Sequence, residues 1–277
     1  MLTGTSETGR GLADRAWGRI RRGATRAGQR IRGIPVRLAE RAAGFPVPPA
    51  RLLHAVGGSD DPSWFLTAGT WAAEDLRNAM ARHGEAIEEV GALLDFGCGV
   101  GRVVRHWGGL AASGVEVVGT DYNPAMIAWC RRNLPFARFA RNAIDGRIDA
   151  DDGTFGLAYA LSVFTHLDEP LQRHWLAELR RVLRPGGFLL ITLHGLPYRD
   201  GLPPEDREAF DRGELVVVGH DRQGSNHCAA FHPPGYLASG PAEDWEILEW
   251  IPEGARGNPR QDAYLLRKPA VARARAA

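Results

Sequence analysis

The sequence has few cysteines, no long apolar run and almost no net charge. Its three cysteines, Cys98, Cys130 and Cys228, are odd in number and scattered, so they do not form a disulfide framework. No apolar run approaches the roughly 20 residues that span a bilayer, and the N-terminus lacks the apolar stretch of a secretory signal. These absences favour a reducing, cytoplasmic setting.

The net charge of +1 hides an uneven distribution of charge along the chain. Residues 1–45 hold ten arginines against three acidic residues, a balance of +7, so the remainder carries −6. A mildly acidic remainder gives no support for a broad or specific nucleic-acid face. The basic extension, residues 1–49, has three interpretations: a poorly ordered tail, an amphipathic helix in weak contact with an anionic membrane or an acidic partner, or a transit-like segment.

The remaining chain is long enough for one large core, and its hydrophobic content of 44% is that of a globular protein. Strand and helix patterns alternate along residues 50–268, which indicates a doubly wound parallel sheet with helices on both faces. A longer helix is expected over 71–90, a Gly- and Pro-rich loop or lid over 194–240, and a frayed tail over 269–277. Strands are expected near 91–96, 115–120, 136–140, 155–161, 187–193, 245–251 and 263–267, and helices near 100–110, 124–133 and 169–183.

One segment is the most informative, Leu93-Leu94-Asp95-Phe96-Gly97-Cys98-Gly99-Val100-Gly101-Arg102. It predicts a buried strand that ends in a tight glycine turn, followed by a helix that begins near Val100. Such a turn lets a ligand lie against the main chain in doubly wound proteins. The spacing differs from the dinucleotide fingerprint G-x-G-x-x-G, because Arg102 stands where the third glycine belongs.

The next strand agrees with a cofactor site. The run from Val115 to Asp121 ends in an acid, which is placed to accept hydrogen bonds from both hydroxyls of a ribose. Asn123 and Pro124 then predict a capped helix start.

The D-x-G-x-G-x-G order, the strand ending at Asp121, and the run Phe155 to Leu167 resemble class I S-adenosylmethionine (SAM)-dependent methyltransferases. The later Leu183-Arg184-Pro185-Gly186-Gly187 resembles their small-molecule branch. The resemblance covers about residues 60–268 and implies a Rossmann-like, seven-stranded, mostly parallel sheet whose last strand is antiparallel. It implies SAM as cofactor and methyl transfer to oxygen or nitrogen of a small-molecule substrate. One departure is Gly156, where the family usually has an acid.

The resemblance also assigns roles to residues. Asp95 and the backbone of Gly97, Gly99 and Gly101 would hold the methionine part of SAM. Arg102 would reach the carboxylate of SAM or, alternatively, be a surface arginine on the first turn of a helix. Asp121 would bind the ribose, with Tyr122 near the adenine. Asn142, with Ala143 beside it, would contact the adenine amino group, and Leu161 and Ser162 would lie beside the sulfonium.

A methyl acceptor that loses a proton needs a general base. The candidates are His166, just past the fourth strand, and His194, just past the fifth; His166 has the alternative role of orienting its loop. The cluster His220, His227, Cys228 and His232 fits no zinc spacing and is interpreted as substrate-loop material.

Two kinds of nucleic-acid methylation are disfavoured by what is missing. No Asn/Asp-Pro-Pro-aromatic stretch follows the fourth strand, and no Pro-Cys dipeptide exists to supply a cytosine-C5 nucleophile. Two alternatives stay open: a SAM-binding protein without catalysis, and a nicotinamide-dependent Rossmann oxidoreductase. The oligomeric state and the acceptor are not predicted.

Overall fold

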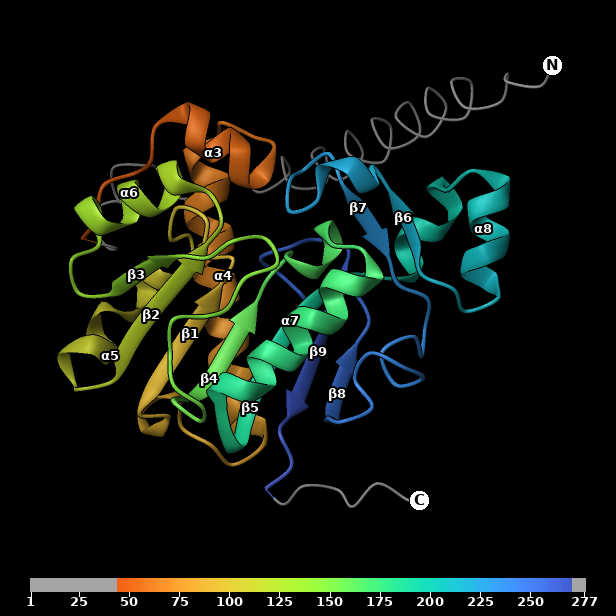
Figure 1. Cartoon of the computed structure of the whole chain (residues 1–277). Coiled ribbons are helices and arrows are strands. Elements are labelled where there is room, and N and C mark those ends of the chain that lie inside the picture. Colours follow the sequence, from red (N-terminus) through yellow and green to blue (C-terminus); the bar gives the residue numbers. More distant parts are fainter. Residues whose placement is uncertain (1–43, 271–277) are drawn as a thin grey trace.

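The structure is a computed structural model that describes residues 44–270. Most of the predicted basic extension (1–49) lies outside the described residues, namely residues 1–43. Most of the predicted tail (269–277) also lies outside them, namely residues 271–277. In the described part, a single mixed sheet runs through the molecule with helices on both sides (Figure 1). No helix in that part is long and apolar enough to cross a membrane.

Within residues 44–270 the sheet has nine strands in the order β3-β2-β1-β4-β5-β7-β6, while β9 pairs with β5 and β8 with β9. The strands are β1 (Ala92–Phe96), β2 (Glu116–Asp121), β3 (Arg138–Arg141), β4 (Phe155–Ala160), β5 (Leu183–His194), β6 (Val216–Val218), β7 (Ala229–Phe231), β8 (Glu246–Ile251) and β9 (Gln261–Arg267). The first five are parallel, and β9 runs antiparallel to β5 from Phe188↔Arg267 to His194↔Gln261. The predicted Rossmann-like α/β class is confirmed, and β6 and β7 raise the strand number above the predicted seven.

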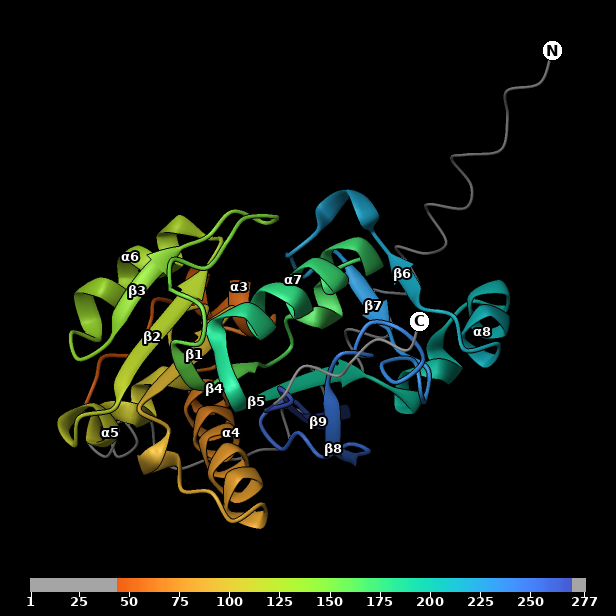
Figure 2. The same ribbon diagram turned by 60° about the horizontal axis from the view of Figure 1, so that its bottom comes forward.

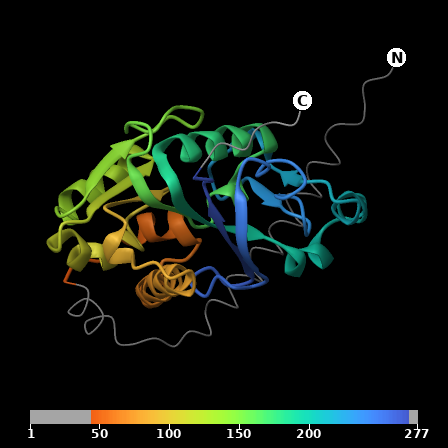
Figure 3. The ribbon, with the colours of Figure 1, turned by 90° about the horizontal axis from the view of Figure 1, so that it is seen from below.

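Helices cover both faces because successive residues of a strand point to opposite sides. The α-helices are α3 (Ala50–Gly57), α4 (Pro62–Arg82), α5 (Gly108–Ala112), α6 (Pro124–Asn133), α7 (Glu169–Val182) and α8 (Pro204–Asp211). On β1, Leu93 packs in the cluster that contains Leu76 of α4, whereas Leu94 packs in the cluster that contains Trp175 of α7. Figure 3 shows α4 and α7 on opposite sides of the sheet.

Side-chain caps begin three of these helices. The Asn123 side chain accepts from the backbone N–H groups of Ala125 and Met126, and Asp168 accepts from that of Leu171, as their sequence positions predict. Asp61 caps α4 in the same way. A proline is the first or second residue after each cap, where its missing N–H costs nothing.

The helix predicted for residues 100–110 is partly wrong. Gly99 and Gly101 have φ of +55° and +72°, values incompatible with a right-handed helix. The chain therefore turns through residues 99–103, and helical structure begins only as a short 3-10 segment, Val104–Trp107, that leads into α5.

The helix predicted for 71–90 begins earlier and ends earlier, at Pro62 and Arg82. Asp61 and Pro62 start the helix before the aromatic pair Trp64 and Phe65, so both residues lie in its first turn. Phe65 is fully buried in the core, while Trp64 lies at the wall of a cavity.

The 194–240 segment is more ordered than its composition predicts. It holds α8 and the β6–β7 hairpin, which Figure 2 shows at the end of β5. The hairpin joins the main sheet through one pair, His194↔Phe231, and its apolar side packs against Tyr198 and Phe210. These contacts connect distant residues, so local periodicity does not reveal them.

The Gly156 departure has a structural reason. A Cβ at this position would lie 2.3 Å from the carbonyl oxygen of Val90. An acidic side chain at residue 156 therefore does not fit this backbone.

Candidate functional site

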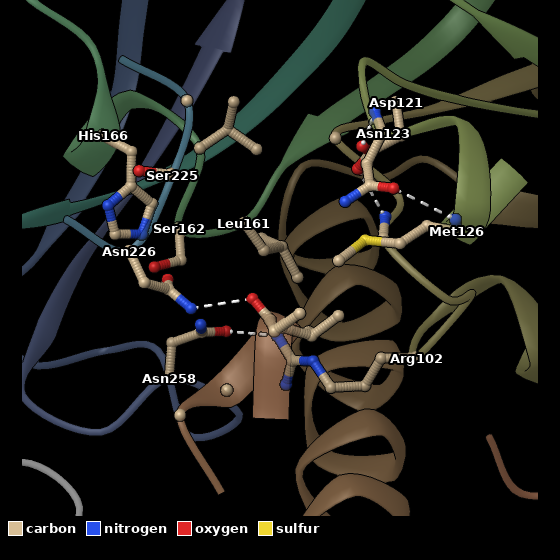
Figure 4. A pocket seen from close by; sticks show the side chains of 18 of the residues that line it. Arg102, Asp121, Asn123, Met126, Leu161, Ser162, His166, Ser225, Asn226 and Asn258 are labelled. Carbon is tan, nitrogen blue, oxygen red and sulfur yellow. Dashed lines mark hydrogen bonds between the residues drawn. The ribbon is translucent and has the colours of Figure 1, made fainter. Parts of the chain in front are cut away.

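A cavity of about 480 Å³ lies at the carboxyl ends of β1, β2, β4 and β5. Ligand sites in open α/β sheets occur at this edge. The end of α3 and the loop around Ser225 cover it, and the Asn226 amide donates to the carbonyl of Ala55 at 2.7 Å (Figure 4). The two covering segments, from opposite ends of the chain, thus meet over the cavity.

Most predicted site residues converge on this cavity. Those that line it are Gly97, Gly99, Arg102, Asp121, Tyr122, Asn142, Leu161, Ser162, His166 and His194. Three predicted residues, Asp95, Gly101 and Ala143, are not part of its lining.

Asp121 holds the glycine turn in place. Its Oδ2 accepts the backbone N–H of Gly99 at 2.9 Å, and its Oδ1 accepts that of Asn123 at 2.8 Å. Burial raises the pKa of Asp121, and these two N–H donors oppose that rise by stabilising the carboxylate. Each oxygen has further lone pairs with which to accept a ligand hydroxyl.

The three glycines have different surroundings. A Cβ on Gly97, at φ +74°, would lie 2.3 Å from Cγ2 of Val163, and Gly97 and Gly99 both face the cavity. A Cβ on Gly101 would instead lie 2.4 Å from Cδ1 of Leu134 on the side of α6. Gly101 therefore serves close packing between the turn and α6.

Asp95 lies beneath the turn. It is 4% exposed and hydrogen bonds the hydroxyl of Tyr159, which accepts from the Trp107 indole at 2.8 Å. Burial raises the pKa of Asp95 to about 7, against the opposing effects of Tyr159 and the nearby Arg102. Asp95 acts on the cavity through these neighbours.

Arg102 is buried and held by a distant segment. Its Nη1 donates to the carbonyl of Gly257 at 2.8 Å and its Nη2 to Oδ1 of Asn258 at 2.7 Å. Its guanidinium also lies 5.5 Å from the ring centroid of Trp64. Burial lowers the pKa of Arg102 to about 10, so it stays charged at neutral pH. A role toward a ligand carboxylate stays a prediction.

Asn142 has a buried polar atom without a partner. Its Nδ2 donates to the carbonyl of Ala143 at 2.9 Å, which leaves Oδ1 as the buried, unpaired acceptor. A buried acceptor without a hydrogen bond costs free energy unless a ligand donates to it. Oδ1 is therefore suited to accept from an amino group, such as that of adenine.

The turn after β4 is strained at the cavity wall. Ser162 has φ of +60°, rare for a residue with a side chain. Its N–H donates to Oγ1 of Thr192 at 2.8 Å, and its Oγ accepts from Nε2 of Gln261 at 2.8 Å. The Thr192 hydroxyl donates in turn to Oε1 of Gln261. This network fixes the backbone beside Leu161 across three strands.

The two candidate bases lie near each other. The ring centroids of His166 and His194 are 6.4 Å apart. Nδ1 of His166 pairs with the carbonyl of Cys228 at 2.7 Å, and Nδ1 of His194 with that of Ala230 at 3.2 Å. Carbonyls only accept, so each Nδ1 carries a proton. Burial lowers the pKa of His194 well below its usual range, with His166 adding to the effect.

The other histidines of the 220–232 segment are dispersed. His227 lines the cavity, whereas His232 is buried and pairs through Nε2 with Oε1 of Gln172 at 3.2 Å. Among the described residues, no group of three His, Cys, Asp or Glu side chains is arranged to hold a metal ion.

Some of the lining was not predicted from sequence. Gln261 and Asn258 are far in sequence from the glycine motif and carry no motif of their own.

Residues 94–191 match the methyltransferase domain family. An uncharacterized 37.1 kDa protein in a transposon of Streptomyces fradiae is 33% identical over 158 residues, 54% of this chain and 41% of that protein. An uncharacterized methyltransferase of Synechocystis is 34% identical over 104 residues, 37% of this chain and 47% of its own. The chain thus spans less than half the length of these curated relatives.

A crystal structure described as a SAM-dependent methyltransferase from Methanosarcina mazei has a similar fold. The TM-score is 0.51 at 19% identity, over 69% of this chain and 98% of that one. The match over residues 94–191, from β1 to β5, confirms the resemblance of the glycine motif to methyltransferases.

Proposed function

We propose that this protein binds SAM in the 480 Å³ cavity and transfers its methyl group to oxygen or nitrogen of a small-molecule acceptor. The observation that carries the proposal is the buried, unpaired Oδ1 of Asn142, in the same cavity as the carboxylate of Asp121. An acceptor for an amino group and an acceptor for ribose hydroxyls are the groups that an adenosine moiety requires. The family match over residues 94–191 supports the same cofactor.

When bound, SAM supplies an activated methyl group on a cationic sulfur, so the protein's share is positioning, exclusion of water and removal of a proton. Asp121 would hold the ribose and Asn142 the adenine. The turn at Gly97 and Gly99 admits the rest of the cofactor close to the backbone. The Ser162 network would keep the β4 turn rigid where the methyl group is to be aligned. Alignment of two bound reactants is worth up to about 7–11 kcal/mol in the best cases.

The covering segments support a small acceptor. The Asn226–Ala55 hydrogen bond joins two segments of the cavity wall, which favours a small molecule over a polymer laid along an open groove. Calorimetric titration tests the cofactor: we expect SAM and S-adenosylhomocysteine to bind and NAD(P)H not to bind. Binding of a nicotinamide cofactor in place of SAM would favour the oxidoreductase alternative.

The proposed bases are His194 and His166. In a screen of acceptors with labelled SAM, His194→Ala or His166→Ala should retain SAM affinity while turnover falls roughly 10²–10⁴-fold. The control is His174→Ala, because His174 is half-buried and pairs with the carbonyl of Gly146, outside the cavity. Unchanged turnover in both variants would reject a histidine base, and no methylation of any acceptor by wild type would favour a SAM-binding protein without catalysis.

A further inference from the structure

A second cavity of about 250 Å³ adjoins the first from the α4 face of the sheet. The α4 residues that line it include Ala72, Asp75, Ala79 and Arg82, which lie on one side of that helix. The opposite wall is formed by β5, the β8–β9 hairpin and the 254–258 segment. Figures 2 and 3 show the hairpin beside α4.

The two cavities meet at two residues, Leu161 and Asn258, which line both. Figure 4 shows both side chains at the wall of the first cavity. Asn258 is held there by Arg102, and Leu161 precedes the strained turn at Ser162. Under the proposed function, Leu161 lies beside the methyl group to be transferred. The second cavity thus begins next to the reacting atom.

The second cavity suits an uncharged, mainly apolar group. Its apolar lining includes Leu161, Leu190, Leu265 and four alanines. The Thr192 hydroxyl on the wall is already engaged as donor to Gln261 and as acceptor from Ser162. It offers no unsatisfied proton to a ligand.

The charges at the mouth compensate one another. Arg82 makes two hydrogen bonds to Glu249, at 2.8 and 2.6 Å, and Asp75 accepts from the backbone N–H and the guanidinium of Arg256. Ile251, 39% exposed, adds an apolar side chain to the same lining. A charged ligand would have to break one of these pairs, whereas a neutral one would not.

We propose that the second cavity binds an uncharged, apolar ring or branched alkyl group of the methyl acceptor, whose reacting oxygen or nitrogen lies in the first cavity. This inference rests on the proposed function. An apolar cavity of about 150 Å³ is large enough for a benzene molecule, so 250 Å³ accommodates a bicyclic ring such as indole.

The test places bulk in the second cavity. Ala79→Leu adds three carbons from α4, and Ala81→Leu makes the same change on the exposed side of that helix. Ala263→Leu fills the same space from β9 and serves if Ala79→Leu does not fold. The probe is indole, titrated into protein saturated with S-adenosylhomocysteine and followed by the methyl NMR signals of Leu161, Leu190 and Leu265.

We expect indole to shift these signals in wild type and Ala81→Leu, and to bind at least tenfold more weakly to the filled variants. Equal binding by the filled variants, or shifts confined to other residues, would overturn the inference. In the labelled-SAM screen, we compare the methylation rate of acceptors that carry the apolar group with the rate of acceptors that lack it. The variants that fill the second cavity should lower this ratio at least tenfold. An unchanged ratio would also overturn it. Failure of wild type to bind SAM would refute the proposed function separately, since that titration contains no indole.

Discussion

Asp121→Asn is the most direct test of the cofactor site. The carboxylate uses one oxygen for the N–H of Gly99 and the other for that of Asn123. An asparagine offers a single oxygen, so its amide nitrogen must face one of these backbone donors. One charge-assisted hydrogen bond, worth about 1.5–3 kcal/mol, is lost before any ligand contact is counted.

That loss corresponds to a decrease in SAM affinity of roughly 10- to 150-fold, provided that the turn must be held for binding. The assay is calorimetric titration of SAM, with thermal unfolding to verify that the variant folds. Asp151→Asn, on an exposed loop, is the matched control and should bind like wild type.

The contact to ribose is separable from the effect on the turn. Wild type should bind S-adenosylhomocysteine more tightly than its 2′-deoxy analogue, and Asp121→Asn should discriminate less between them. A folded Asp121→Asn variant with wild-type SAM affinity would refute the assignment of this carboxylate.

Three further predictions concern buried groups around the site. Burial holds the pKa of Asp95 at about 7, above its unfolded value, so the folded state retains a proton that the unfolded state releases. The free energy of unfolding of wild type, relative to that of Asp95→Asn, should therefore fall as the pH rises from about 4 to 7. Urea titrations at a series of pH values measure this difference. Burial lowers the pKa of His232 to about 3, so as the pH decreases the unfolded state takes up a proton before the folded state does. At pH values below 6.5 the free energy of unfolding should therefore decrease, by up to about 1.4 kcal/mol per pH unit. His232→Gln should reduce that slope, and an unchanged slope would contradict the prediction. Gly97→Ala places a Cβ on a residue with a left-handed φ, 2.3 Å from a side-chain atom of Val163, so it should weaken SAM binding at least tenfold. Adding Val163→Ala to this variant removes the close contact and should restore part of the lost affinity.

The parts of the fold that follow from short segments were predictable. The apolar run before Asp95 forms a buried strand, and Asn123-Pro124 and Asp168 start helices because a capping side chain acts within three residues. Asp121 was also placed correctly, at the end of its strand and at the wall of the cavity.

The glycine turn shows where local patterns fail. Its spacing indicated a helix directly after Gly99, but the left-handed φ of Gly99 and Gly101 delays the helix to Val104. The N–H of Gly99 consequently points at Asp121 and not at a ligand. Glycine permits a left-handed φ without requiring it, so the sequence pattern leaves both conformations open.

The sites proposed for the methyl donor and for the methyl acceptor also differ in how well the sequence predicts them. Asp121 and Asn142 follow consecutive strands of one parallel sheet, whose carboxyl ends must meet, so short motifs suffice to place them. The wall next to Leu161 instead comes from Arg102, Asn258 and Gln261, whose hydrogen bonds join residues that are 69 to 156 positions apart. Such pairings depend on the packing of β9 against β5, which no local spacing specifies. The same argument explains why the proposed methyl donor could be predicted from the sequence, whereas the proposed acceptor has to be inferred from the cavities.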